Sequence, residues 1–133
     1  MNLPQAPQSQ AQSAPAKMPI EQVCDFLCSY ASTLLQNGAY TARIIKCTDR
    51  IGRNYGYEVH LSIFLQYITL NITDIHDYNN RRTQVIKNTH LGMNLSLISN
   101  LSALSWQIYD ENISLEEARE HFAYICEQKH LPI

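Results

Sequence analysis

The sequence lacks any uninterrupted run of about 20 apolar residues, the length that a helix needs to cross a bilayer. Its first 17 residues also lack the charged start and apolar middle of a secretory signal. A formal net charge of -2, without a basic tail, gives no general attraction to nucleic acid. From these absences we expect the chain as it stands to be soluble and cytoplasmic, with no nucleic-acid partner.

Catalytic and metal-binding patterns are equally scarce. The sequence has no Gly-x-Ser-x-Gly elbow, no phosphate-cradling glycine loop and no His-Glu-x-x-His motif. The segment Asp74-Ile75-His76-Asp77 gathers two carboxylates and an imidazole, but these residues are ordinary near a hairpin turn, so we interpret the segment as structural. The sequence therefore predicts no catalytic site, no metal site and no cofactor.

The cysteines stand in apolar helical settings rather than in close pairs at metal-ligand spacing, and we expect them to be reduced, buried thiols. They are Cys24, Cys28, Cys47 and Cys126.

Composition divides the chain into two parts. Residues 1–17 are rich in Gln, Ala, Pro and Ser, and we expect a disordered tail because they cannot bury enough surface to offset the entropy of ordering. Residues 18–133 are predicted to form a single domain, since the remaining length leaves room for one modest core.

Two helices are predicted after the tail. Apolar residues recur at helical spacing from Ile20 until Asn37-Gly38, which is a good left-handed helix end. Thr41 is predicted to cap a second helix, which carries a buried apolar stripe and closes at Gly56.

After Gly56 the apolar period changes from 3.6 to 2. Strands are predicted over residues 57–63, 68–73 and 82–86, with a turn at residues 77–80. Such a meander is antiparallel and exposed on one face.

The helical period returns from Leu91 through Leu95 to Ile108, and Ser114-Leu115-Glu116-Glu117 is a capping box that opens a last helix. The element order predicts an α+β fold: two helices, a three-stranded antiparallel meander and two helices, with the helices packed on one face of the sheet.

A basic edge is predicted on the second helix, because four cations recur there at spacings that place them beside the buried stripe. They are Arg43, Lys46, Arg50 and Arg53. Two interpretations stay open. The edge is either a solvated flank that covers apolar neighbours, or it faces an anion such as a carboxylate solute, lipid headgroups or an acidic partner surface. Acidic residues dominate from Asp110 onward, so complementary patches also allow a homo-oligomer.

Several segments in order resemble one family. The segments are Leu34-Leu35-x-x-Gly38-Ala39-x-Thr41-x-Arg43, Arg50-Ile51-Gly52-Arg53, Tyr55-Gly56, the meander, Arg82 before Met93-Asn94-Leu95, and Ser114-Leu115-Glu116-Glu117-Ala118. Together they resemble the hydrophilic amino-terminal domain of the bacterial threonine/serine exporter family, ThrE, including its YjjP-type members. The resemblance covers about residues 20 to 131.

The resemblance implies a domain on the cytoplasmic face of the bacterial inner membrane, with membrane-embedded transporter helices or a transporter subunit as its partner. It implies an accessory or regulatory role in the export of threonine and serine, or of a dicarboxylate such as succinate. The family's membrane helices lie outside these 133 residues. Ile45 stands where the family usually has an acidic residue, and Tyr40 replaces another, so an Arg-Glu pair is not carried over.

The alternative is a small sensor or hydrolase-like domain that binds an amino-acid-like carboxylate. Its pocket would lie near Arg43, His60 and Arg82, because guanidinium groups suit a carboxylate. His60 is predicted to point outward from the first strand, where a solvated histidine is the other interpretation.

Overall fold

The computed structural model describes residues 17–88 and 92–128. The elements are α2 (Ile20–Gln36), α3 (Thr41–Asn54), β1 (Tyr57–Phe64), β2 (Tyr67–Asp74), β3 (Asp77–Lys87), α4 (Leu95–Glu111) and α5 (Leu115–Gln128). This order confirms the predicted α+β fold. Apart from Lys17, the expected tail lies outside the described residues, and so does Leu91.

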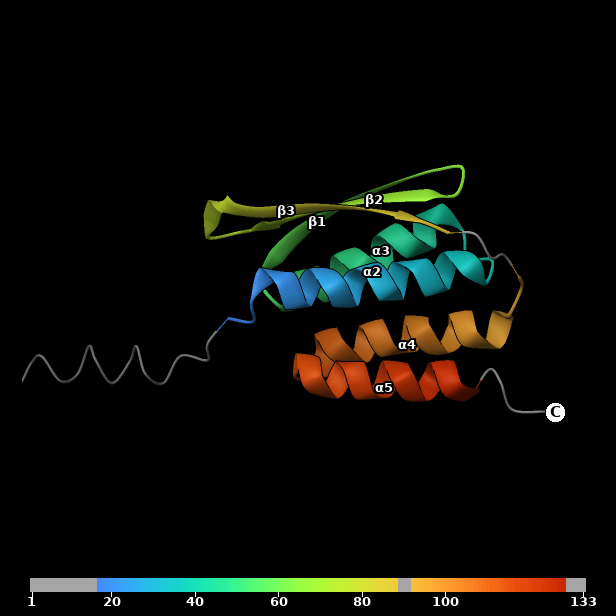
Figure 1. Ribbon diagram of the computed structural model, residues 1–133. Helices are drawn as coiled ribbons and strands as arrows, with labels where there is room; N and C mark the ends of the chain where they lie inside the picture. Colours follow the sequence, from blue (N-terminus) through green and yellow to red (C-terminus); the bar gives the residue numbers. More distant parts are fainter. Residues whose placement is uncertain (1–16, 89–91, 129–133) are drawn as a thin grey trace, which may run out of the picture.

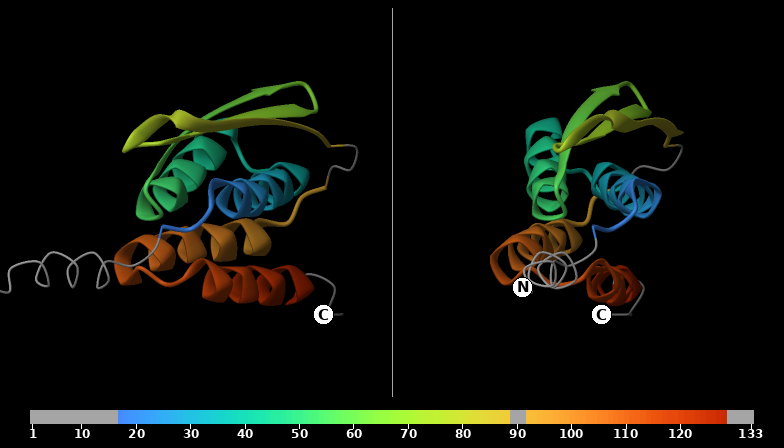
Figure 2. Two further views of the ribbon diagram at one scale, coloured as in Figure 1. Left: turned by 60° about the vertical axis from the view of Figure 1, so that its left-hand side comes forward. Right: turned by 90° about the vertical axis from the view of Figure 1, so that its left-hand side faces the viewer.

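The elements form three layers (Figure 1). The sheet packs on α2 and α3, and these two helices pack in turn on α4 and α5 (Figure 2). The helices thus lie on one face of the sheet, as predicted, but only the first pair touches it closely. Among the described residues, no helix has both the length and the apolar character needed to cross a membrane.

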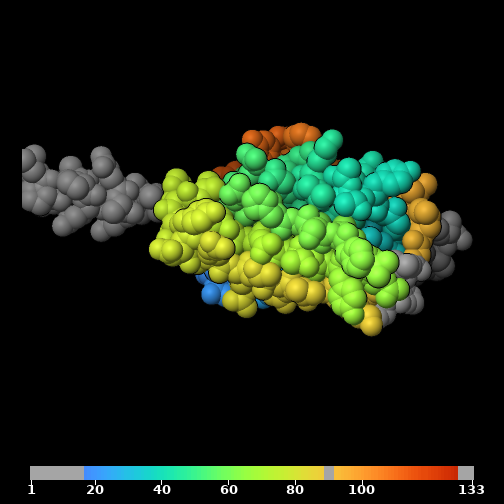
Figure 3. All heavy atoms as spheres, turned by 90° about the horizontal axis from the view of Figure 1, so that it is seen from above, coloured from blue at the N-terminus to red at the C-terminus, as the bar shows by residue number. Residues whose placement is uncertain are grey.

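The sheet is an antiparallel meander in the order β1-β2-β3. Ile68, Leu70 and Ile72 of β2 are fully buried against the helices. The other face of the strands forms the outer surface of the molecule (Figure 3).

The second hairpin turns earlier than predicted. Ile75 and His76 form the turn and β3 begins at Asp77, so the prediction of a turn at residues 77–80 and a strand start at residue 82 is wrong. The Asp74 carboxylate accepts a hydrogen bond from the His76 N–H at 2.8 Å, which stabilises the turn at Ile75 and His76. Thr73 pairs with Arg81 but Asp74 pairs with Asp77, so the register shifts between Thr73 and Asp74, and residues 78–80 of β3 are left without a partner in β2.

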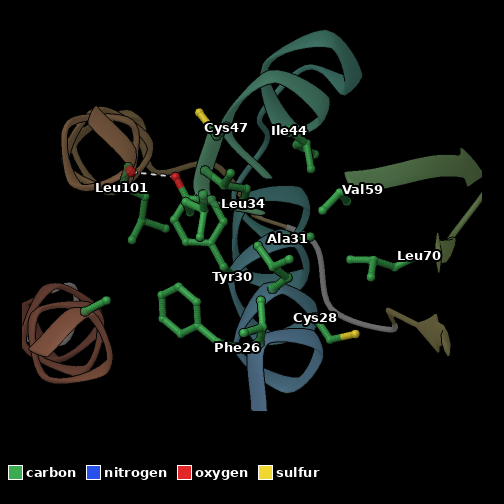
Figure 4. Packing of buried hydrophobic residues seen from close by; sticks show 14 of the residues in the cluster. Phe26, Cys28, Tyr30, Ala31, Leu34, Ile44, Cys47, Val59, Leu70 and Leu101 are labelled. Carbon is green, nitrogen blue, oxygen red and sulfur yellow. Dashed lines mark hydrogen bonds between the residues drawn. The ribbon is translucent and has the colours of Figure 1, made fainter. Parts of the chain in front are cut away.

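Helix α2 is buried on opposite sides because it lies in the middle layer. Ala31 faces the sheet, whereas Phe26 and Tyr30 point toward α4 and α5 (Figure 4). The Tyr30 hydroxyl donates a hydrogen bond to the Leu101 carbonyl oxygen in α4, and burial raises the pKa of this phenol, which keeps it a neutral donor.

The α2–α3 corner is held by backbone hydrogen bonds. Gly38 has φ +96°, its N–H donates to the Leu35 oxygen at 3.2 Å, and the Ala39 N–H donates to the Leu34 oxygen at 3.1 Å. This is a Schellman motif, and it confirms the predicted left-handed helix end.

Of the two helix caps predicted at Thr41 and Ser114, one is wrong and one is confirmed. The prediction that Thr41 caps α3 is wrong: Tyr40 is the N-cap, and its carbonyl accepts from the Ile44 N–H at 3.1 Å. Thr41 already lies inside the helix because the extended Tyr40 backbone ends the corner one residue earlier than expected. Ser114 does cap α5, since its Oγ accepts from the Glu117 N–H at 3.1 Å.

In α4, Leu95 was predicted on the buried stripe but is 68% exposed. The helix begins at Leu95. Asn94 is its N-cap, because the Asn94 side chain accepts a hydrogen bond from the Leu97 N–H at 3.0 Å, and the buried face starts with Leu97.

Candidate functional site

The basic edge of α3 faces α4. The apolar stripe of α3, including Ile44 and Ile51, is buried, and the cations occupy the neighbouring flank. Since α4 packs beside α3, that flank meets the α4 face that carries Ser102, Ser105 and Trp106.

An open hollow of about 320 Å³ lies between the two helices. Its lining residues are Tyr40, Arg43, Lys46, Cys47, Arg50, Ser102 and Trp106. A second hollow of about 270 Å³ adjoins it, because Lys46, Arg50 and Trp106 line both.

Hydroxyl groups of α4 hold the two guanidinium groups. Arg43 Nη1 donates to Ser102 Oγ at 3.0 Å, and Arg50 Nη1 donates to Ser105 Oγ at 2.8 Å. The Arg50 Cζ atom also lies 3.6 Å from the centre of the Trp106 ring, which is close stacking. These partners are neutral, so they orient the arginines without cancelling their charge.

The first hollow is strongly cationic. Its lining contains Arg43, Lys46 and Arg50 but no acidic residue. In residues 17–88 and 92–128, none of these three cations forms a salt bridge. The nearby Asp49 instead pairs with Arg53, with 2.8 Å between Oδ2 and Nε.

This arrangement suits the binding of a small anion. Arginine and lysine donors bind carboxylate or phosphate through charge-assisted hydrogen bonds, and the Tyr40 and Trp106 rings supply apolar walls. The lining holds neither a carboxylate nor an imidazole.

The three predicted ligand-binding residues do not meet. His60 lies on the outer face of the sheet, where its Nε2 is 3.4 Å from Glu58 Oε2. Arg82 stands opposite Ile72 in the register, so its side chain leaves the sheet on the helix-facing side. The hydrogen bond from Cys28 is the largest cause that lowers the pKa of Cys24, and the nearby charge of Arg82 adds to it. Only Arg43 of the three lines the hollow.

The α4 half of the site was missed in the sequence. Ser102, Ser105 and Trp106 share one helical face, which is a visible pattern, but nothing in the sequence tells that this face meets α3.

The other sequence candidates have structural surroundings. Cys24, Cys28 and Cys47 are buried as expected, and Cys126 is partly buried. The Asp74 carboxylate binds the Lys17 ammonium group, and no cluster of three or more metal-ligating side chains occurs in the part of the chain that the structure describes.

A family model for ThrE, the threonine/serine exporters, matches residues 25–132. The match spans the elements from α3 to α5 and most of α2, and therefore includes the whole hollow. No curated protein and no solved structure was found to match the chain.

Proposed function

Because this chain belongs to the ThrE family of threonine/serine exporters, we propose that it is the cytoplasmic accessory domain of an inner-membrane exporter of small polar metabolites. In this proposal, membrane-embedded helices or a membrane subunit form the translocation path, and this domain assembles with them. The domain regulates export by binding the carboxylate of the exported solute.

One observation carries the proposal: three cations without a carboxylate partner in the described chain face one open hollow. Leaving cations together at a protein surface costs electrostatic repulsion, which a bound anion would relieve. The volume of about 320 Å³ is at the small end for ligand pockets, which suits threonine, serine or a short dicarboxylate such as succinate.

Calorimetric titration of the chain with threonine, serine and succinate tests solute binding. We expect saturable heat with at least one of them. Since a charge-assisted hydrogen bond contributes about 1.5–3 kcal/mol, Arg43→Ala should weaken binding roughly tenfold or more. Trp106 gives a second readout because it is the single tryptophan and stacks on Arg50.

Arg81→Ala is the matched control for this titration. It removes the same charge from an exposed position on β3, outside the lining of the hollow. Flat titrations with all three solutes, or equal losses with Arg43→Ala and Arg81→Ala, would contradict solute binding at this site.

Gene context tests the exporter role separately. We expect the same or an adjacent reading frame to encode several apolar segments of about 20 residues. A free-standing carboxylate sensor is the second candidate, because all residues of the hollow come from this domain. Solute binding without any such membrane segments would favour the sensor. Pairing between copies through the basic α3 flank and the acidic α4–α5 region stays a prediction.

A further inference from the structure

Exposed apolar side chains gather at one end of the molecule. The β1–β2 turn, the α2–α3 corner and the start of α4 all lie at the same end, on the right in Figure 1. We call the exposed apolar residues of these segments the apolar end: Tyr40, Phe64, Leu65, Tyr67, Met93 and Leu95.

Backbone hydrogen bonds hold this end in shape. The Asn88 N–H donates to the Gln66 oxygen at 2.8 Å and ties the β1–β2 turn to the end of β3. The Asn94 N–H donates to the Asn37 oxygen at 3.1 Å and ties the start of α4 to the α2–α3 corner. The apolar end is therefore a fixed part of the fold.

Leu65 is an unusual residue for its position. It is 78% exposed, and its φ of +57° lies in the left-handed region that favours glycine or asparagine. Neighbouring Phe64 is 74% exposed. Solvation and backbone conformation both disfavour leucine at this turn, and contact with an apolar environment outside the domain would offset the cost of exposing it.

Charge is distributed along the same axis. Each helix and strand has one half that is nearer to the apolar end. Of the 12 acidic residues, only Glu127 lies in such a half. Arg43, Lys46 and Lys87 lie in such halves. The apolar end is therefore basic as well as apolar, whereas the opposite end carries most of the acidic groups.

We propose that the apolar end docks on the anionic face of a lipid bilayer. Aromatic and aliphatic side chains insert at the level of the headgroups, and lysine and arginine bind anionic lipids beside them. A hairpin tip that carries Phe64 and Leu65 suits a soft lipid interface, because it projects and needs no complementary groove. The acidic opposite end is repelled by the same surface, and this orients the domain. This contact goes beyond the proposed assembly with membrane helices because the partner is lipid.

Flotation of the 133-residue chain with lipid vesicles tests the docking surface. We expect binding to vesicles of phosphatidylethanolamine and phosphatidylglycerol, weaker binding to phosphatidylcholine alone, and loss of the difference in high salt because salt screens exposed charges. The variant Phe64→Ser/Leu65→Asn should bind the anionic vesicles roughly tenfold less, since it removes two inserted apolar side chains. Asparagine tolerates the left-handed backbone, so this variant should remain folded.

The matched control is Ile75→Ser/Tyr78→Ser, which removes two exposed apolar side chains from the opposite hairpin. It should bind like the unchanged chain. Absence of vesicle binding, equal losses in the two double variants, or full binding by Phe64→Ser/Leu65→Asn would each overturn the proposal. A dimer that Phe64→Ser/Leu65→Asn dissociates would overturn it too, because a second copy would then cover the apolar end. Tyr40, Arg43 and Lys46 also line the α3–α4 hollow, but both double variants leave them unchanged, so solute binding is decided by its own titration.

Discussion

Asp74 shows how one side chain fixes two distant parts of the chain. Its carboxylate binds the Lys17 ammonium group, accepts from the His76 N–H at 2.8 Å and accepts from the Asn80 amide at 3.3 Å. These bonds lower the pKa of Asp74 to about 2, with the hydrogen bond from Lys17 as the largest cause. The segment before α2 is thereby joined to the β2–β3 turn.

The lowered pKa predicts a defined pH dependence. An unfolded aspartate has a pKa of about 3.9, so the ionised Asp74 stabilises the fold fully above about pH 4 and loses this effect as the pH falls toward 2. Urea unfolding at pH 6, 4 and 2.5 should therefore show Asp74→Asn well below the unchanged chain at pH 6, with a clearly smaller difference between the two at pH 2.5.

Asp110→Asn is the control for that series, because Asp110 is exposed and forms no salt bridge within the described residues. A stability difference for Asp74→Asn that stays constant from pH 6 to 2.5 would contradict the assigned role.

Helix α3 and strand β1 approach each other closely at Gly52. A Cβ atom added there would lie 2.3 Å from Val59 Cγ2. Glycine inside a helix costs about 1 kcal/mol relative to alanine, so the position gives up helix stability in exchange for close packing on the sheet.

Gly52→Ala should lower the free energy of unfolding by about 1–3 kcal/mol, because overpacking outweighs the gain in helix propensity. Val59→Ala removes the clashing methyl groups, so the double variant should lose less stability than the sum of the two single variants. Denaturant titration measures all three.

Gly92→Ala serves for comparison, since the nearest atom to its added Cβ is the Gln36 oxygen at 3.8 Å. Losses that simply add for Gly52→Ala and Val59→Ala would argue against the contact.

Local patterns were enough to predict the elements and the buried stripes of the first two helices, but not the face that each β3 side chain takes. The period of 3.6, the Asn37-Gly38 end and the Ser114 cap depend on neighbouring residues, and the structure confirms them. The β2–β3 turn depends on hydrogen bonds of Asp74, and the position of that turn decides which face each β3 side chain takes. For this reason His60 and Arg82 were predicted to share one pocket, whereas in the structure they lie on opposite faces of the sheet.

The three layers share their core through α2, which packs against both the sheet and the α4–α5 layer. The candidate site depends on this arrangement, because α3 packs on α2 and on α4, and α4 also packs on α2. Such pairing between distant helices carries no short-range signature, so the cations of α3 were predictable and their α4 partners were not.

A shared core predicts a single unfolding transition. Trp106, the only tryptophan, lies in α4 and reports on the layer farthest from the sheet, whereas far-ultraviolet circular dichroism reports on all helices and strands. Thermal unfolding followed by the two signals should give the same midpoint. A fluorescence change at a clearly lower temperature would mean that α4 and α5 detach before the rest unfolds.

The central place of α2 also matters during synthesis. It is the first of these helices to leave the ribosome, yet it packs against β3, α4 and α5, which follow much later. Its two apolar faces stay without native cover while most of the domain is translated, and Tyr30 meets Leu101 only after 71 further positions. Native structure therefore forms late on the nascent chain, and protection of α2 by a chaperone would matter most before α5 emerges.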